Sequence, residues 1–293
     1  QVSIDSAHFL KNLRTLVRHH DAPVYTINSY SQWRLMETVY EHGYKVAVSG
    51  VGADELFSGY FDHHNAYLAA MKVEDLGRYT DALRDWNTLI APIVRNPFLQ
   101  DPDYLVDTPG GRDHIYLDAD LFSSMLRKPF GELFEETAYS NTLLRNRMAN
   151  ELRHEAVPVM LHEDDLNAMY YSIENRSPFL DTALFEVAQS IPTRHLIRAG
   201  RAKAVLRDAV RGLAPVSVID NPRKVGFNVP IFEYLDINNN VVREELLDDS
   251  PIYEIVKREE IERLFYQTEL TNSRSKFLFN FICAKIFLEE YAI

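Results

Sequence analysis

The stretch that most constrains the fold is VAVSGVGADELFSGY, at residues 46 to 60. It begins like a buried strand, breaks at Gly50 and Gly52, and places Asp54 and Glu55 where a helix should begin. Glycine lets a backbone approach a ligand closely, and a helix N-terminus carries partial positive charge. A strand, a glycine turn and a helix in this order therefore predict a loop that offers N–H groups to an anion.

The two acids at the tip of this loop admit two interpretations. Acids in a first helical turn are often only partners of the helix dipole. The alternative is a divalent cation, because carboxylates would repel phosphates directly, whereas Mg²⁺ accepts both in its octahedral shell. In that case Asp54 and Glu55 hold the metal, and the metal holds the phosphates.

The segments before the loop predict the edge of a parallel sheet. APVYTINSY, which contains Pro23, is a short β-prone run, SQWRLMETVYEHG is typical of a helix ended by Gly43, and YKVAVSG is a strand. This β-α-β spacing favours a ligand crevice at the carboxyl end of the second strand.

Beyond about residue 54, apolar residues recur every three or four positions. This pattern predicts helices over 54–72, 74–90, 117–127, 130–152, 159–173, 182–190, 201–212 and 274–291. No repeat or low-complexity linker is present. We therefore expect residues 1–60 to end an α/β nucleotide-binding layer and residues 61–293 to form the helical part of the same body.

Composition narrows the class of protein. The 31 basic and 43 acidic residues give a net charge of −12, without a dense basic run, which argues against extended binding of nucleic acid or an anionic membrane. Cys283 is the single cysteine, so a disulfide framework is excluded and a reducing cytoplasm is expected. The hydrophobic C-terminal stretch is interrupted by charges and predicts a buried terminal helix rather than a membrane span. Because the chain opens with Gln1 instead of Met, we expect a fragment of a longer protein.

A second cluster of polar residues lies within an apolar segment at residues 157 to 181. On a single helix the directions of Asp164 and Glu174 would differ by about 80 degrees, so both could line one side of a cavity. A solvated charged face is the competing interpretation.

A third cluster is NPRKVGFNVPIF, in which Arg223 and Lys224 precede a Gly-Phe turn between prolines. A cation on such a constrained loop can be aimed at a pyrophosphate or at a developing oxyanion. The competing interpretation is an ordinary surface loop.

Together the clusters resemble the synthetase domain of asparagine synthetase-type, glutamine-hydrolysing amidotransferases. VSGVGADELFSGY is similar to that family's second nucleotide-site motif, DDLNAMYYSIENRSPFLD to its central helix motif, and RAKAVLRDAVRGLAP with NPRKVGFNVP to its closing basic motif. The resemblance covers about residues 6 to 291. It implies an α/β fold with a partial parallel sheet of adenine-nucleotide α-hydrolase type, followed by a predominantly helical region.

The resemblance also implies a chemistry. ATP activates a carboxylate as an acyl-adenylate and releases pyrophosphate, and ammonia or an amine then displaces AMP to form an amide. Matched positions place Ser49, Gly50 and Gly52 at the nucleotide and Asp54 at Mg²⁺ and pyrophosphate. Glu55 is a weaker candidate for the metal, and Lys224 is expected to stabilise the departing charge.

The partners implied are a small-molecule or carrier-linked carboxylate and ammonia from a glutaminase domain outside this chain. A homodimer is left open.

Three departures from the family's pattern limit these expectations. The upstream Ser-Gly-Gly-x-Asp pyrophosphate loop and the N-terminal cysteine nucleophile are absent, so we expect the chain alone to bind ATP weakly and to be inactive by itself. Val51 stands where asparagine-forming members carry a glutamate and β-lactam-forming relatives a tyrosine. An aliphatic side chain cannot move a proton, which makes aspartate a doubtful substrate.

If a proton must move, Asp164 or its neighbour Glu163 is the catalytic candidate, with Glu174 in a secondary role. Arg176 is expected to anchor Glu174 or Asp181. The rival hypothesis is a catalytically silent relative with a binding or regulatory role.

Overall fold

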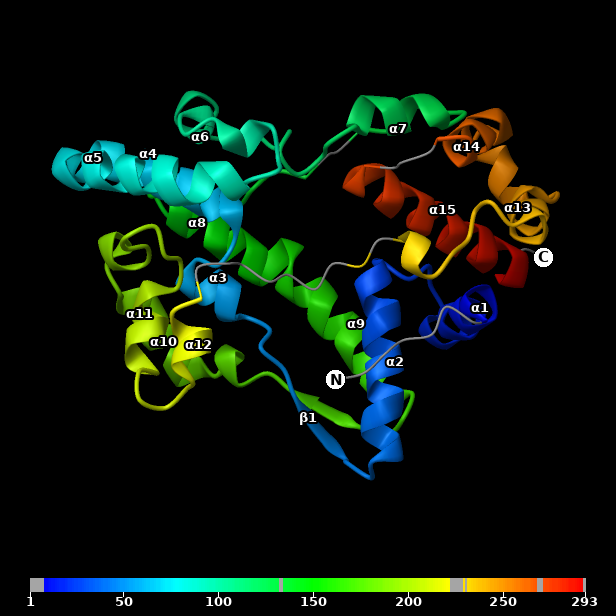
Figure 1. The fold of residues 1–293 in the computed structure, drawn as a ribbon, viewed down its shortest axis with the longest axis horizontal. Helices are drawn as coiled ribbons and strands as arrows, with labels where there is room; N and C mark the ends of the chain where they lie inside the picture. Colours follow the sequence, from blue (N-terminus) through cyan, green and yellow to red (C-terminus); the bar gives the residue numbers. More distant parts are fainter. Residues whose placement is uncertain (1–7, 132–133, 222–228, 230, 268–270, 292–293) are drawn as a thin grey trace.

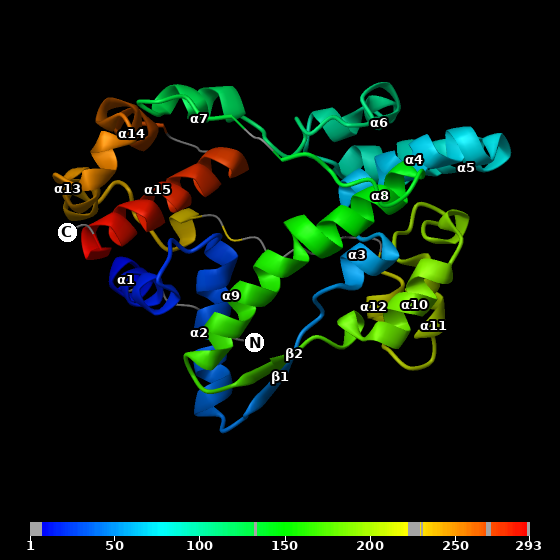
Figure 2. The same ribbon diagram turned by 180° about the vertical axis from the view of Figure 1, so that it is seen from behind.

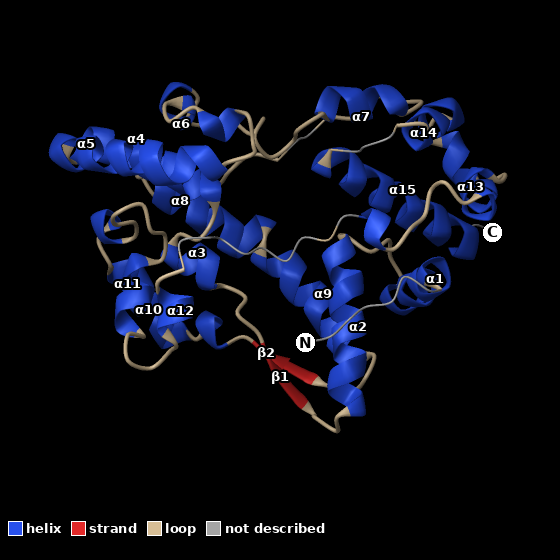
Figure 3. Ribbon diagram, in the orientation of Figure 1, coloured by secondary structure: helices blue, strands red, loops and turns tan. Residues whose placement is uncertain are grey.

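The computed structural model describes residues 8–131, 134–221, 229, 231–267 and 271–291. Helices dominate, and one pair of short strands lies at the lower edge of the molecule (Figure 3). The described chain therefore has the predicted character, a small parallel sheet with a large helical part.

The sheet contains β1 (Val46–Val48) and β2 (Glu174–Arg176). The strands are parallel, with Val46 opposite Glu174 and Val48 opposite Arg176. The side chain of Val48 is 71 % exposed, so the expectation of a buried strand is wrong for the described chain, in which β2 is the one strand beside β1.

The strand predicted after Pro23 is also wrong, because helix α2 (Ile27–Glu41) begins within that run. Thr26 is extended, and Ile27, Tyr30 and Trp33 recur at helical spacing and are all buried. Tyr30 packs edge-on against Phe9 with ring centroids 4.9 Å apart. Packing thus overrides the β propensity of the run. Gly43, with φ of +78°, ends this region as predicted.

One hydrophobic core joins α1 (Phe9–His20) and α2 to the C-terminal helices α13 (Asn240–Leu247), α14 (Arg258–Phe265) and α15 (Asn272–Tyr291). Leu278, Phe279 and Ile282 of α15 are completely or almost completely buried, as predicted for a terminal core helix. No helix among the described residues is long and apolar enough to cross a membrane.

A second core lies on the other side of the molecule (Figure 1). It is built from α4 (Phe61–Glu74), α5 (Leu76–Asp85), α6 (Tyr104–Asp107) and α8 (Leu143–Asn150). A smaller cluster beneath it packs α3 (Ala53–Phe57) against α10 (Thr182–Ser190), near α11 (Ala204–Ala209) and α12 (Val216–Ile219).

The two cores are bridged by α9 (Val157–Met169), which continues the line of α8 through a π-helical turn, Glu151–Glu155 (Figure 2). Pro158 stands at the start of α9 and cannot donate a backbone hydrogen bond to the turn before it, where Ala156 N–H donates to the Glu151 carbonyl, 2.9 Å away. The proline is thus compatible with the widened turn.

Several predicted helices differ from those observed. The helix predicted over 54–72 is broken at Ser58, which has φ of +62°, and the one over 130–152 begins only at Leu143. Helix α9 ends at Met169, and Ser172, with φ of +56°, turns the chain into β2. Glu174 is therefore on a strand, beyond the helix predicted over 159–173, so the condition that it shares a helix with Asp164 is not met.

The connection between α6 and α8 crosses the top of the molecule and carries α7 (Ala119–Met125) to the C-terminal side (Figure 1). There Leu126 forms an antiparallel bridge with Val256, and Phe122 stacks on Phe277 at 4.5 Å. This long connection contributes one wall of the cavity described below.

Candidate functional site

A cavity of about 1030 Å³ lies along α9. Its walls come from the N-terminal part of α2, the loop after β1, the π-helical turn, residues 112–116 and Lys276 of α15. Its volume is in the range of pockets that enclose a whole small molecule.

The loop after β1 supplies Ser49 and Val51 to the cavity wall. Ser49 extends the ladder by donating its N–H to the Arg176 carbonyl at 2.8 Å, and its hydroxyl lies 2.9 Å from that of Ser177. Gly52 has φ of +94°, and an added Cβ would lie 2.4 Å from Leu180 Cδ2. The glycine turn is therefore required by the packing, which fixes where the loop meets the cavity.

Asp54 forms an ion pair with Lys203, whose Nζ lies 2.9 Å from Oδ1. Lys203 adopts φ of +56°, which is unusual for a long side chain, and a Cβ on Gly59 would lie 2.6 Å from Lys203 Cε. The backbone is thus shaped around this pair. The sequence pattern of the RAKAVLR motif assigns no role to its lysine, and the left-handed conformation has no signature in the sequence.

Glu55 points in another direction. Its side chain is buried, with 1 % of the residue exposed, and its carboxylate accepts a hydrogen bond from the Tyr60 hydroxyl. Burial and the neighbouring Glu55 charge raise the pKa of Tyr60. Glu55 therefore has a partner inside the protein, and its role as a metal ligand stays a prediction.

Glu163 and Asp164, the candidates for proton transfer, are both buried and both line the cavity. Glu163 accepts hydrogen bonds from the backbone N–H of Tyr25, at 2.7 Å, and from the Ser29 hydroxyl. Burial raises the pKa of Glu163 to about 7, with a further contribution from Asp164. Burial also raises the pKa of Asp164, against hydrogen bonds from Gln32 and Asn175.

The remaining predicted site residues lie elsewhere. Glu174 is exposed, and its Oε1 accepts a hydrogen bond from Arg176 Nε at 2.9 Å, which lowers the pKa of Glu174. The anchoring role expected for Arg176 is thereby confirmed, and Glu174 does not line the cavity. Lys224 lies outside the described residues.

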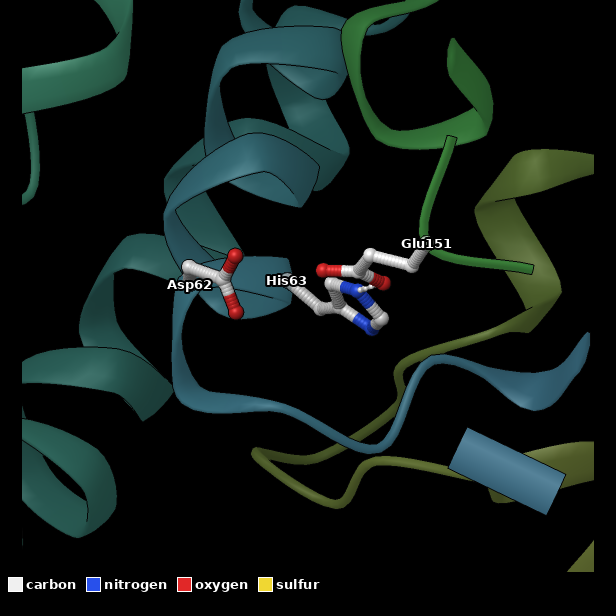
Figure 4. Close-up of side chains that lie close together, drawn as sticks. All are labelled: Asp62, His63 and Glu151. Carbon is white, nitrogen blue, oxygen red and sulfur yellow. Dashed lines mark hydrogen bonds and ion pairs between the residues drawn. The ribbon is translucent and has the colours of Figure 1, made fainter. Parts of the chain in front are cut away.

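A buried charged cluster that the sequence did not reveal lies at the π-helical turn. Asp62 and His63 of α4 face Glu151, and His63 Nε2 is 2.7 Å from Glu151 Oε2 (Figure 4). The three side chains offer ligand atoms within 4.8 Å of one another. Arg147 Nε already lies 3.3 Å from both Asp62 Oδ2 and Glu151 Oε1, so a guanidinium supplies the positive charge that a metal would bring.

The fold and the cavity define a class of protein, an α/β body in which a glycine loop after a strand shares a cavity with buried acids. Residues 1–287 match the family model of asparagine synthase, and the chain belongs to that family. The adenine-nucleotide α-hydrolase type stays a prediction.

The chain is also similar to curated proteins that are named as asparagine synthetases. The chain is 24 % identical over 263 residues to asparagine synthetase [glutamine-hydrolyzing] 1 of Bacillus subtilis, a match that covers 84 % of this chain and 41 % of the relative. It is 26 % identical over 211 residues to putative asparagine synthetases [glutamine-hydrolyzing] of Mycobacterium bovis and Mycobacterium tuberculosis, over 65 % of this chain and 30 % of each relative. The chain thus spans less than half the length of these relatives.

Proposed function

We propose that this chain is the synthetase part of an ATP-dependent, amide-forming ligase. A substrate carboxylate oxygen attacks the α-phosphorus of ATP and pyrophosphate leaves. Ammonia or an amine then attacks the acyl carbon, AMP leaves, and a base takes the excess proton. One observation carries the proposal. Ser49 and Val51 of the loop line the same cavity as the acids Glu163 and Asp164.

The nucleotide would be held at the loop that follows β1. Ser49, Gly50 and Gly52 would bring the backbone close to a ligand, and Asp54 and Lys203, which do not line the cavity themselves, present a carboxylate and an ammonium 2.9 Å apart. This donor set fits magnesium pyrophosphate, because the carboxylate suits the metal and the ammonium suits the phosphate oxygens. When bound, Mg²⁺ would neutralise phosphate charge.

Proton transfer would fall to Glu163. A general base works best when its pKa lies near the working pH, and the pKa of Glu163 is about 7. Val51 carries no titratable group, so it cannot serve as the base itself. Asp164 is the neighbouring candidate, although its carboxylate is already engaged by Gln32 and Asn175.

The substrates are a carboxylate and a nitrogen donor. Val51 removes a charge that would otherwise face the ammonium of an amino acid, so we expect a larger or amine-free carboxylate instead of free aspartate, including a sugar acid or a carrier-linked acid. The relatives are named as glutamine-hydrolysing, which supports ammonia from a glutaminase domain outside this chain. The cytoplasmic location and the formation of a homodimer stay predictions.

A second candidate function is a catalytically silent binding protein, which Val51 favours. Pyrophosphate release by the complete protein that contains this chain distinguishes the ligase from the silent binding protein. We expect release to depend on both ATP and a carboxylate. A complete protein that releases no pyrophosphate with any carboxylate of a broad panel would favour the silent relative.

Asp54→Asn provides the matched test of the nucleotide site. The change should abolish pyrophosphate release, because the metal and phosphate lose a charged partner. It should cost the fold only ~0.3–1 kcal/mol through the helix dipole, since the ion pair with Lys203 is partly exposed. Normal release by a folded Asp54→Asn variant would remove Asp54 from the proposed site.

A further inference from the structure

Helix α15 contributes one residue, Lys276, to the wall of the cavity. The two neighbours of Lys276 in sequence hold the backbone in place. Ser275 is buried and accepts a hydrogen bond from the Ile231 N–H at 3.2 Å, and Phe277 stacks on Phe122. Lys276 itself is exposed. The origin of its side chain is therefore fixed, while the side chain remains open to solvent and to a ligand in the cavity.

Lys276 differs from the two arginines of the cavity wall, because both arginines already have an acidic partner. Arg112 donates to Glu155 Oε2 at 2.7 Å, and Arg147 donates to Glu155 Oε1 at 2.8 Å. Lys276 has neither a hydrogen bond nor an ion pair with any residue that the structure describes. An anionic ligand would have to compete with Glu155 for either arginine, whereas the ammonium of Lys276 can bind an anion without breaking an existing contact.

Lys276 also lies apart from the groups to which we assign the reaction. The pKa of Glu163 is set by burial, by a backbone hydrogen bond and by Asp164, with no contribution from Lys276. An ammonium close to Glu163 would have lowered that pKa. Helix α15 and strand β1 lie on opposite sides of α9 in both Figure 1 and Figure 2, so the loop after β1 and Lys276 belong to different parts of the cavity wall. Lys276 is thus available to a part of the substrate other than the reacting carboxylate.

We propose that Lys276 binds a second anionic group of the carboxylate substrate, either a phosphate ester or a further carboxylate. This inference rests on the proposed function, which assigns the chemistry to the loop at Val51 and to Glu163. A lysine ammonium is a compact charge with three donors, which suits the oxygens of a phosphate or of a carboxylate. The substrate class is thereby narrowed to acids with a negative charge at both ends. A sugar acid that is linked to its carrier through a phosphate meets this condition.

The test is binding without ATP, measured by ligand-detected NMR on the complete protein at low salt. The ligands are glucuronate, which has one anionic group, and glucarate and glucuronate 1-phosphate, which each have two at opposite ends. We expect at least one of the doubly charged acids to bind about fivefold more tightly than glucuronate, which is the upper range for an exposed ion pair. The acid that gains more identifies the second anionic group. Equal affinities for all three acids would overturn the inference.

Variants of Lys276 show whether this side chain is the source of the preference. Lys276→Met removes the ammonium and should abolish the preference without changing glucuronate binding, whereas Lys276→Arg keeps a cation and should retain it. Lys128→Met is the matched control, because Lys128 is also exposed, has no ion pair within the described ranges and does not line the cavity. A preference that survives in Lys276→Met, or that is lost equally in Lys128→Met, would overturn the inference. Loss in Lys203→Met alone would place the anion at the nucleotide loop and would likewise overturn it.

Pyrophosphate release with the same acids separates this inference from the proposed function. Doubly charged acids that bind with the expected variant pattern but release no pyrophosphate would leave the role of Lys276 standing and remove the ligase. Release that is equally efficient with singly and doubly charged acids, in wild type and in Lys276→Met alike, would keep the ligase and remove the inference.

Discussion

Two groups of buried or half-buried acids lie in or beside the cavity, and they differ in whether a cation neutralises their charge. Near the π-helical turn, Asp62, Glu151 and Glu155 share Arg147 and neighbouring cations. On α9, Glu163 and Asp164 have hydrogen bonds from neutral groups, and no ion pair within the described ranges. An acid paired with arginine stays ionised and holds elements together, whereas an acid buried without a cation is poised to exchange a proton near neutral pH.

The pKa values of Asp62 and Glu163 follow this difference, whereas burial raises the pKa of Glu151 despite the lowering effect of His63 and Arg147. Burial alone would raise the pKa of Asp62, yet His114, His63 and Arg147 lower it well below its usual range. Glu163 has no such cation and its pKa rises to about 7. We therefore assign stability to the first group and chemistry to the second.

The largest expected effect comes from breaking the paired group. Arg147→Met leaves several buried carboxylates without their common partner, and removing one member of a buried ion-pair network typically costs about 3–5 kcal/mol. Urea unfolding at pH 7 measures this cost. A loss below about 1 kcal/mol would show that the arginine is dispensable and that the two groups do not differ as described.

Glu163→Gln should have the opposite effect on stability. The folded-state pKa of about 7 lies above the ordinary value of 4.5, so the wild-type protein loses stability as pH rises between these values. Glutamine cannot ionise, so the variant does not lose stability over this pH range. After allowance for partial solvation, we expect the variant to be more stable than wild type by about 2 kcal/mol at pH 8, with little of that gain at pH 5.

The same variant tests the chemical role of Glu163. Activity of the complete protein should fall by about 10²–10⁴-fold, and the rise in wild-type rate near pH 7 should disappear. Asp164→Asn is the control on the neighbouring acid and should retain that rise. A wild-type-like pH profile in Glu163→Gln would transfer the proton-transfer role to another residue.

Local sequence patterns predicted part of this arrangement and long-range contacts decided the rest. The strand at 46–48, the stop at Gly43 and the terminal helix follow from periodicity and glycine chemistry, which act over a few residues. The partner strand, Glu174–Arg176, is too short to show a period and lies more than a hundred residues from β1. Its pairing could not be predicted from local pattern.

The candidate site divides in the same way. Glu163 and Asp164 were identifiable because acids interrupt an apolar segment, and Asp54 because it follows a glycine turn. Lys203 and Arg147 gain their roles from partners far away in sequence, Asp54 and Asp62, and those contacts depend on how helices pack. Pro158 did carry a readable signal for a disturbed helix, since proline cannot donate to the turn before it.

The smallest expected effect concerns Glu174, which belongs to neither group. Its carboxylate is exposed and pairs with Arg176, and solvent screens exposed ion pairs, so they contribute little to stability. Glu174→Gln should therefore leave the urea unfolding midpoint nearly unchanged and leave pyrophosphate release within about twofold of wild type. Raised salt should remove even that difference, because it screens exposed charges. A loss of activity as large as that of Glu163→Gln would show that Glu174 reaches the reacting groups in the complete protein, and the division between buried and exposed acids would fail.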